Sequence, residues 1–324
     1  MKVMLQPSGH VIELLPGEKI IDAARRLGFD APQSCRNGNC HICAANLISG
    51  SVRQGDDIFK SGELFTCLAE PLSDCELQWD GVLAANELPL CKVACQLLSV
   101  TPLGADVFSV HLRLPAGKVV RYHAGQYLLL ERESGESSAF SIASAPQQGR
   151  ELELHILARD NVTVDLLKYL QKERMARVQM PFGDVHLAVA DQRPLLLIAA
   201  GTGMAQVHSL VEHCRATGFS QPIHVYWGAR VADDFYMLQD LAAWQSMSNL
   251  HFHQIVSDDN GWNGRVGLLY QAVCSDIQHL GDYRVIVSGS PAMVYGTFDA
   301  LVAAGMQPEQ MHADVFTYAP RAEA

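Results

Sequence analysis

The sequence lacks any run of about 18 uncharged apolar residues, the length that a helix needs to cross a bilayer. Its first ten residues contain no apolar segment followed by a small-residue cleavage site, so nothing there indicates export. Internal repeats and low-complexity tracts are absent as well. We therefore expect a cytoplasmic protein without a membrane span.

Positive charge is also scarce. Lys and Arg total 24 against 35 Asp and Glu, which gives a formal net charge of −11. Proteins that bind nucleic acid neutralise its phosphates with Lys and Arg, so a nucleic-acid partner is not expected. An acidic surface suits a basic or neutral protein partner instead. Hydrophobic residues make up 48% of the 324 residues, enough for two or three domains with separate cores.

Cysteine, by contrast, is abundant, with nine residues. In a reducing compartment these do not form a disulfide scaffold, so clustered cysteines indicate metal ligands or catalytic groups. Cys35, Cys40 and Cys43 have the spacing Cys-x4-Cys-x2-Cys, and Cys67 follows after 23 further residues. This is the plant-type ferredoxin spacing, in which four thiolates hold a 2Fe-2S cluster. Gly38 supplies permissive backbone for the tight loop.

Zinc and buried structural thiols are the alternatives for this cluster of cysteines. Zinc sites usually pair two short Cys-x2-Cys motifs, and this stretch contains one, so zinc is disfavoured. Among the five other cysteines, Cys91-x3-Cys95 has a spacing that could bind metal but lacks a second pair, so we predict buried structural thiols for all five. They are Cys75, Cys91, Cys95, Cys214 and Cys274.

The spacing of apolar residues changes twice along the chain. Short apolar runs with one helix, expected at 20–27, predict a first domain over 1–88, and a linker is expected at 84–92. Closely spaced strands separated by Gly and Pro predict an antiparallel barrel over 93–190, with strands expected at 93–100, 107–114, 126–131, 140–143 and 151–157 and a helical stretch at 165–170. Strands that alternate with helices, expected at 195–199, 223–227, 251–256 and 284–288, predict a parallel α/β domain over 191–324.

A glycine-rich turn joins an expected strand at 195–199 to an expected helix at 204–216. The turn is Gly201-Thr202-Gly203. Glycines at this place allow a pyrophosphate to approach the exposed amides at the positive end of the helix dipole. Taken alone, the motif fits a plain tight connection equally well.

Together the three patterns resemble the ferredoxin-NADP reductase superfamily with an N-terminal plant-type 2Fe-2S ferredoxin domain. The nearest groups are the CDP-6-deoxy-glucoseen reductases and the reductase components of ring-hydroxylating oxygenases. The resemblance implies a multidomain chain of α+β and α/β type, with a β-grasp ferredoxin domain, an antiparallel β-barrel flavin domain and a parallel α/β nucleotide-binding domain. It is carried by the cysteine motif and by residues 124–127, 140–144, 201–203, 226–228, 288–293 and 314–316.

The resemblance implies an NAD(P)H-dependent oxidoreductase. A hydride carries two electrons together, whereas a 2Fe-2S cluster accepts one, so a flavin must divide the pair. Electrons would pass from NADH through FAD to the cluster and on to a one-electron acceptor protein. That partner would be a dehydratase, an oxygenase or another iron-sulfur protein.

Position within the family motifs assigns the remaining site residues. Phe140 would lie against the flavin ring, with Ser141 beside its reactive nitrogen. Ser288 would lie beside the nicotinamide, where many relatives have Cys, and Asp314 would lie near the flavin. Ser141, Ser288 and Asp314 are thus the predicted catalytic residues. The predicted cofactor-binding residues are Gln126, Tyr127, Phe140, Ser141, Ile142, His155, Ile156, Thr163, Gly201, Thr202, Gly203, Arg230, Gly289 and Phe316.

Two positions depart from the family pattern. Ser138 replaces the Arg that normally neutralises the flavin phosphate, and the usual helix-capping Gly-x-x-Ser is blurred around Thr163. Both predict weak or replaced binding of the flavin phosphate, with Arg132 or Arg159 as substitutes. Two alternative functions follow: a reductase for which flavin is a dissociable substrate, and an iron-sulfur redox module with a degraded flavin site.

The choice between NADH and NADPH depends on the end of the second strand of the α/β domain. Asp233 and Asp234 follow that strand, and carboxylates near the ribose repel a 2′-phosphate while they accept a bond from a 2′-hydroxyl. They favour NADH. Arg230 is the contrary feature, because an Arg there would hold the phosphate of NADPH.

Overall fold

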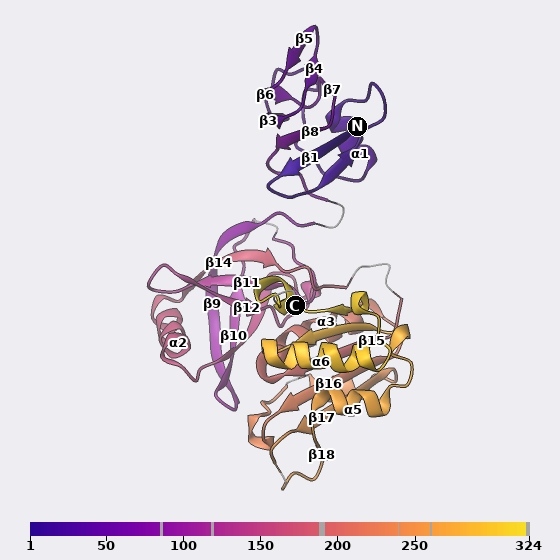
Figure 1. Ribbon diagram of the computed structural model, residues 1–324. Coiled ribbons are helices and arrows are strands. Elements are labelled where there is room, and N and C mark those ends of the chain that lie inside the picture. The colour runs from indigo at the N-terminus through magenta and orange to yellow at the C-terminus, as the bar shows by residue number, and fades with distance from the viewer. Residues whose placement is uncertain (85–86, 118–119, 188–191, 239, 260, 322–324) are drawn as a thin grey trace. The chain divides into compact units, whose positions relative to one another are not determined.

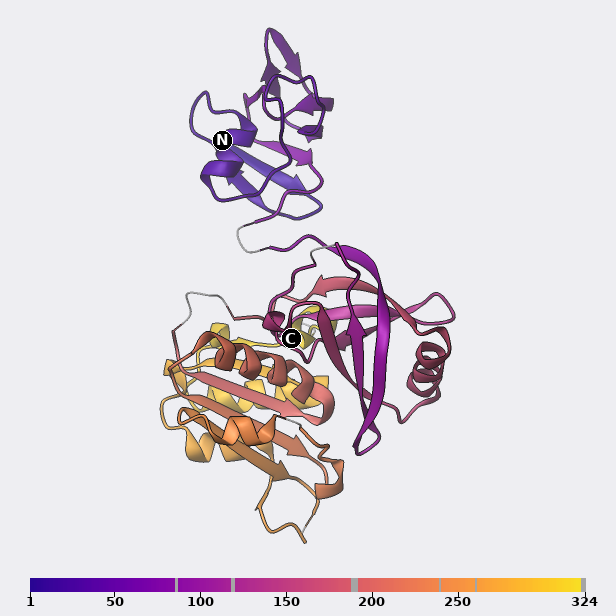
Figure 2. The same cartoon turned by 180° about the vertical axis from the view of Figure 1, so that it is seen from behind.

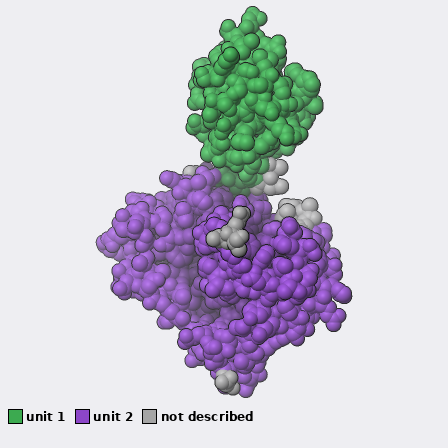
Figure 3. Space-filling model, viewed as in Figure 1, with its two compact units in different colours: residues 1–89 green, residues 90–324 purple. Residues whose placement is uncertain are grey.

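The computed structural model describes residues 1–84, 87–117, 120–187, 192–238, 240–259 and 261–321 (Figure 1). The chain divides into two compact units, residues 1–89 and 90–324, which Figure 3 colours separately. The predicted boundary between 190 and 191 lies outside the described residues. Within the described part, no helix is long and apolar enough to cross a membrane.

The first unit is a mixed sheet packed against one helix. Its strand order is β2-β1-β8-β3-β6, with β1 and β8 parallel and the other pairs antiparallel, and a smaller sheet has the order β5-β4-β7. Apolar residues at helical spacing bury one face of α1 in the core, so the predicted β-grasp fold is confirmed. The elements are β1 (Lys2–Gln6), β2 (Val11–Glu13), α1 (Ile20–Arg26), β3 (Ala44–Ser49), β4 (Val52–Gln54), β5 (Asp57–Phe59), β6 (Gly62–Phe65), β7 (Ala69–Pro71) and β8 (Cys75–Gln78).

The second unit begins with an antiparallel barrel of strand order β12-β11-β14-β9-β10-β13. A bridge between Ile142 and Leu154 joins the end of β12 to β13 and closes the barrel. Helix α2 contributes leucines to the barrel core, and it begins where the Asp160 carboxylate accepts the N–H of Thr163 at 2.7 Å. The elements are β9 (Cys91–Gly104), β10 (Val107–Arg113), β11 (Tyr127–Glu131), β12 (Ser137–Ser141), η1 (Pro146–Gln148), β13 (Glu151–Leu157), α2 (Asn161–Glu173) and β14 (Met175–Phe182).

A parallel sheet of strand order β18-β17-β16-β15-β19-β20 follows in the same unit. Strand β15 is apolar throughout because parallel strands are buried on both faces. Helices α5 and α6 cover the face seen in Figure 1, and α3 and α4 cover the face seen in Figure 2. The elements are β15 (Leu195–Ala200), η2 (Gly201–Gly203), α3 (Met204–Thr217), β16 (Ile223–Ala229), η3 (Ala232–Asp234), α4 (Leu241–Gln245), β17 (Leu250–Val256), β18 (Arg265–Val266), α5 (Leu269–Asp276), η4 (Leu280–Asp282), β19 (Arg284–Ser288), α6 (Pro291–Ala303), η5 (Pro308–Gln310), β20 (Met311–His312) and α7 (Val315–Tyr318).

The strand order reverses beside β15. From β15 the chain moves outward through β16 and β17, then returns to place β19 on the other side of β15. Open parallel sheets bind ligands outside the carboxyl ends of their strands at such a switch point. The glycine turn after β15 and the residues after β19 meet there.

Polar side chains of α3 join the sheet to the barrel. Buried Gln206 donates to the carbonyl oxygen of Gly125 at 2.7 Å, and the Ser209 hydroxyl donates to the carbonyl oxygen of Ser144 at 2.8 Å. These bonds pair backbone carbonyls at the junction, and the carbonyl oxygen of Ser144 also accepts the Tyr122 hydroxyl at 3.2 Å. They fix the barrel strands relative to the switch point.

One group of predictions needs correction. Of the five cysteines expected to be buried, Cys91 is half-buried and Cys274 is exposed, whereas the other three are buried. Helix α5 turns Leu269, Ala272 and Val273 into the core, and Cys274 falls outside that face.

Candidate functional site

The loop between α1 and β3 carries three of the four predicted cluster ligands. The N–H of Cys40 donates to Sγ of Cys35 at 3.3 Å. The backbone of Asn37 and the side chain of Cys40 lower the pKa of Cys35 to about 6, which favours the thiolate. Gly38 has φ +82°, and a Cβ there would lie 2.9 Å from Leu68 Cδ1, so glycine allows the loop to fold closely.

The four sulfur atoms come together as two pairs. The Cys35 and Cys40 side chains interact with each other, as do those of Cys43 and Cys67. Burial, with the Cys43 thiol beside it, raises the pKa of Cys67 to about 11, so iron would have to displace a proton there. Across the described residues, no three His, Cys, Asp or Glu side chains converge on a single ion. Two thiolates for each of two irons is the donor set of a 2Fe-2S cluster, and the residues fit it.

Three adjoining cavities lie between the barrel and the parallel sheet. The barrel-side cavity of about 310 Å³ is bounded by strands β11 and β12 and by the C-terminal residues. The central cavity of about 250 Å³ shares Phe140, Ser141 and Ser288 with it. The sheet-side cavity of about 560 Å³ shares Thr202 with the central cavity. The three therefore follow one another from the barrel wall to the switch point.

Most of the predicted site residues line these cavities. Tyr127 and Asp314 line the barrel-side cavity, His155 lines the central one, and Arg230 lines the sheet-side one. The complete set of predicted residues that line a cavity is Tyr127, Phe140, Ser141, His155, Gly201, Thr202, Gly203, Arg230, Ser288, Gly289 and Asp314.

Five predicted residues lie elsewhere. Ile142 and Ile156 are buried in the barrel core, and Thr163, in the first turn of α2, donates to the N-cap residue Asp160. Gln126 donates to the carbonyl oxygen of Gly183 at 2.9 Å and so braces the strand ends. Phe316 packs against aromatic rings of α6, with ring centroids 5.5 and 5.6 Å apart.

Sequence reasoning missed Gln206, Tyr236 and Tyr318, which line the cavities. It named Arg159 only as a substitute for the flavin-phosphate Arg, and this side chain lines the sheet-side cavity. Tyr318 stands two positions after Phe316 and lines the barrel-side cavity in its place. On the short helix α7 the two side chains point in different directions, which the sequence pattern alone did not reveal. Gln206 and Tyr236 belong to no motif that marks chemistry.

Asp314 is a half-buried carboxyl that lines the barrel-side cavity. Burial raises its pKa to about 6, although the Gln206 amide donates to Oδ2 at 2.9 Å and favours the charge. Gly183 allows this approach, because a Cβ there would lie 3.0 Å from Asp314 Oδ1 and from the Tyr127 ring. The carboxyl can therefore exchange a proton near neutral pH.

Glycine also brings the carboxyl ends of β15 and β19 together. A Cβ on Gly203 would lie 2.3 Å from the carbonyl oxygen of Ser288. Likewise, a Cβ on Gly289 would lie 2.3 Å from Met293 Cε. Both turns expose backbone to the central cavity, which fits the close approach of a dinucleotide.

The region expected to hold the flavin phosphate has few free charges. Asp160 already occupies the N-cap of α2, where Thr163 donates through its N–H at 2.7 Å and its hydroxyl at 2.8 Å. Arg132 pairs with Glu136 at 2.6 Å, and Arg159 pairs with Asp234 at 2.7 Å. Both arginines expected to replace the motif Arg are thus engaged by carboxylates.

A one-electron cluster site lies in the first unit, and a cleft for a flavin and a dinucleotide lies in the second. Because the cluster takes single electrons, a flavin must stand between it and a nicotinamide. The two units therefore define an electron-transfer reductase of the ferredoxin-reductase type.

Comparison with known proteins agrees with this class. Residues 3–72 match the 2Fe-2S iron-sulfur cluster binding domain, and residues 197–298 match the oxidoreductase NAD-binding domain. The CDP-6-deoxy-L-threo-D-glycero-4-hexulose-3-dehydrase reductase of Yersinia pestis is 30% identical over 327 residues, which cover 98% of each chain. The NAD(P)H-flavin reductase of Vibrio harveyi is 31% identical over 236 residues, 70% of this chain and 99% of the relative. The crystal structure of Amycolatopsis cytochrome P450 reductase GcoB has a TM-score of 0.67 at 26% identity, covering 96% of this chain and 97% of that one.

The chain belongs to the family of iron-sulfur flavoprotein reductases that join a 2Fe-2S ferredoxin domain to ferredoxin-reductase-type FAD and NAD domains. It is an NAD(P)H-dependent oxidoreductase that passes electrons from NADH through FAD to a 2Fe-2S cluster. The predicted resemblance, activity and cofactors are confirmed. Reductases of this family deliver electrons to dehydrase or oxygenase partners.

Proposed function

We propose that the ferredoxin unit hands single electrons to a dehydratase, with an oxygenase as the alternative acceptor. The observation that carries this is the match with the Yersinia dehydrase reductase over nearly the full length of both chains. The unit also presents an apolar contact beside the cluster, because Ile42, between two ligands, is 51% exposed. An exposed apolar side chain next to a redox centre suits transient docking of a partner.

We further propose roles for the residues that line the cavities. Phe140 packs against the flavin ring, and Ser141 orients it through a hydrogen bond. The turns at Gly201–Gly203 and Ser288–Gly289 receive the nicotinamide nucleotide at the switch point. Asp314 lines the barrel-side cavity and, with its near-neutral pKa, is one of the groups there that can bind a proton. FAD supplies the step from an electron pair to single electrons.

An anaerobic NADH titration of the purified protein tests this function. We expect visible bands of both flavin and cluster, and both should bleach with NADH. Electrons should then leave one at a time to ferricyanide. Absence of iron after anaerobic purification would refute the assignment. The partner is tested by adding candidate dehydratases and oxygenases to the reduced protein and recording which of them reoxidises it.

A second candidate function treats flavin as a dissociable substrate. It is favoured by Ser138, by the two paired arginines, and by the likeness of residues in the second unit to the Vibrio flavin reductase. Flavin that separates from the protein on gel filtration would support it, and stoichiometric flavin would reject it. Replacing Ser138 with Arg should strengthen FAD binding by about tenfold, because it adds a charge-assisted bond to phosphate. Ser137→Arg, on the opposite face of β12, is the matched control.

A further inference from the structure

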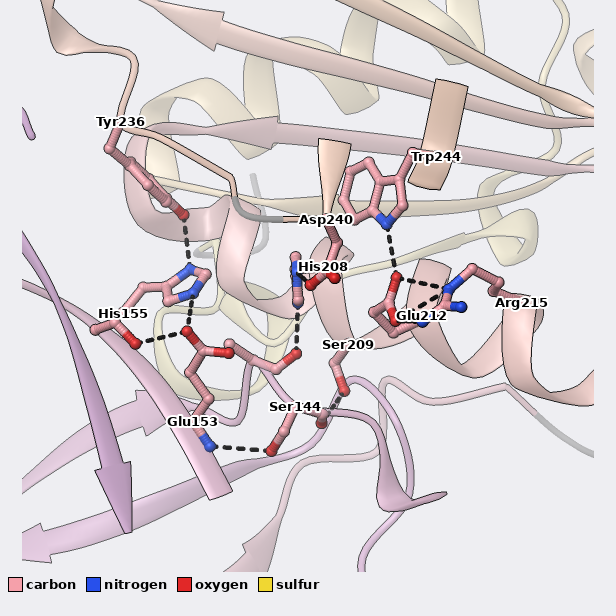
Figure 4. Close-up of polar contacts among 12 residues, drawn as sticks. Ser144, Glu153, His155, His208, Ser209, Glu212, Arg215, Tyr236, Asp240 and Trp244 are labelled. Atoms are coloured by element: carbon pink, nitrogen blue, oxygen red, sulfur yellow. Dashed lines mark hydrogen bonds and ion pairs between the residues drawn. The ribbon is translucent and has the colours of Figure 1, made fainter. Parts of the chain in front are cut away.

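A chain of buried polar side chains begins at His155, which lines the central cavity (Figure 4). Nε2 of His155 lies 3.3 Å from Oε1 of Glu153, and Nδ1 of His155 lies 3.0 Å from the hydroxyl of Tyr236. The Ser109 hydroxyl donates to the same oxygen of Glu153 at 2.6 Å. The side chains of His155 and Glu153 are only 3% and 13% exposed. Keeping a carboxylate and an imidazole from water costs stability, so the pair needs an explanation.

The neighbouring His208 is held as a cation. Its Nδ1 lies 2.9 Å from the carbonyl oxygen of Ala143, and its Nε2 lies 3.1 Å from Oδ2 of Asp240. Both partners only accept hydrogen bonds, so both ring nitrogens carry hydrogen. Burial lowers the pKa of His208, but the bonds to Asp240 and Ala143 outweigh burial and raise it. His208 therefore has no capacity for a further proton.

His155 is different, because one of its partners can donate. Its Nε2–H donates to Glu153, and its Nδ1 can accept the hydroxyl hydrogen of Tyr236. Burial lowers the pKa of His155, while Glu153 acts in the opposite direction. Burial also opposes the charge of Glu153, but His155 and Ser109 hold the pKa of that carboxyl at about 2. A neutral imidazole beside a fixed carboxylate is the arrangement that accepts and stabilises one proton.

His155 and Glu153 connect the reaction cleft to solvent. His155 lines the central cavity together with Ser141 and Ser288. On the far side, Nε2 of His111 lies 3.6 Å from Oε1 of Glu153, and the His111 side chain is 30% exposed. A proton on His155 therefore has a route of ionisable groups toward solvent.

Electron transfer from NADH to the cluster requires a route by which a proton leaves the cleft. Oxidation of NADH delivers two electrons and a proton as hydride, and the cluster accepts electrons only. One proton for each NADH must therefore leave the cleft. Resting on that electron path, we propose that His155 is the residue that takes up and releases this proton. The proton would be freed in the cleft when its bond to the reduced flavin breaks as both electrons leave for the cluster. Tyr236, which lines the sheet-side cavity, would take it on its hydroxyl oxygen and give its own hydrogen to Nδ1 of His155. The Nε2–H bond would then break, and that proton would pass through Glu153 to His111 and solvent.

Ionisable groups from each neighbouring element face His155. They are Glu153 on its own strand, His111 on β10, His208 on α3 and Tyr236 after η3, with Asp240 beyond His208. Asp314 is the competing proton site, since it lines the barrel-side cavity. The test must therefore separate His155 from Asp314.

The experiment compares His155→Gln, Glu153→Gln and Asp314→Asn in the full-length protein, with His213→Gln as the matched control. His213 is a half-buried histidine on α3 that bonds Gln147 away from the cleft. Anaerobic stopped flow records flavin bleaching by NADH, then reoxidation by ferricyanide, while a pH-indicator dye records proton release. A separate equilibrium titration measures how the midpoint potential of the flavin changes with pH.

In His155→Gln, the rate of proton release relative to the rate of flavin bleaching by NADH should fall by about 100-fold. The flavin potential should also depend less on pH around neutrality, which a purely structural role would not produce. Glu153→Gln should slow proton release about tenfold. This variant tests the proposal if His155→Gln does not fold. Wild-type proton release in either folded variant, or a loss confined to Asp314→Asn, overturns the proposal. Failure of NADH to bleach the flavin in the wild type would instead refute the electron path.

Discussion

At the scale of single residues, a few backbone amides of the cysteine loop set the protonation state of Cys35, a predicted iron ligand. Backbone amides of the loop point at the sulfur of Cys35 and stabilise its thiolate before any metal binds. The spacing of the four cysteines predicts a common ligand set, and the structure shows the side chains of Cys35 and Cys40, and those of Cys43 and Cys67, interacting in pairs. The pairing of Cys43 with Cys67 needed the structure, since it depends on where β6 ends.

Replacing Cys40 with Ser should remove one of the two thiolates in its pair. Because a hydroxyl is a poor ligand for iron, the cluster should be lost or strongly depleted. We expect less than about half of the wild-type iron per chain, with weaker visible absorbance. Cys274→Ser, an exposed cysteine on α5, is the control and should keep its colour. Unchanged iron content in Cys40→Ser would show that the ligand set is wrong.

Asp314 gives a prediction about stability and pH. Its pKa rises from an ordinary 3.8 to about 6 on folding, so the folded state holds the proton more tightly than the unfolded state. That contribution is complete below about pH 4 and is lost as the pH rises through about 6. Asp314→Asn, which cannot ionise, should therefore be more stable relative to wild type at about pH 8 than at about pH 4, by up to about 3 kcal/mol. Thermal unfolding at the two pH values measures this, and an equal difference at both would contradict it.

At the scale of elements, the strands that follow the linker were easier to predict than helix α2, which lies where the family has its flavin-phosphate motif. Strands 151–157 and 284–288 were predicted with the bounds that β13 and β19 have, because buried apolar runs end sharply at turns. Strand β14 was missed, since Arg177 and Gln179 interrupt its apolar pattern and Pro181 reads as a breaker. Helix α2 was predicted only from Asp165, because its first turn is built by the Asp160 cap and not by apolar spacing.

Reliance on local sequence patterns also explains the errors within the site. Motifs located the walls of the cavities but not the direction of each side chain, so Phe316 was predicted where Tyr318 lies. The buried pair of His155 and Glu153 depends on contacts between β13, β10 and the residues after η3, which no local pattern contains.

The predicted role of the turn at the switch point in NADH binding can be tested by adding one methyl group at Gly203. Gly203→Ala would place a Cβ 2.3 Å from the carbonyl oxygen of Ser288, so the turn after β15 must shift. We expect NADH binding to weaken by at least about tenfold, measured as the KM or Kd for NADH, with the cluster spectrum unchanged. Gly281→Ala, where a Cβ would meet nothing within 4 Å, should bind normally. Wild-type affinity in Gly203→Ala would show that the turn does not approach the nucleotide.

At the scale of the whole molecule, each unit has a hydrophobic core of its own. One cluster of buried residues lies entirely within Met1–Pro89, and three lie within Leu90–Ala324. The four cysteines belong to the first unit, and the three cavities belong to the second. Each unit therefore contains the residues predicted to bind its own cofactors.

This separation predicts that the chain can be divided after Pro89 without loss of either chemistry. The fragment 1–89 should fold and show the cluster spectrum, because its core and ligands are intact. The fragment 90–324 should bind FAD and bleach with NADH. Mixed together, the fragments should transfer electrons more slowly by at least about tenfold, because the covalent connection supplies a high effective concentration. Reconstitution at the rate of the intact chain would show that the link between the units adds nothing to electron transfer.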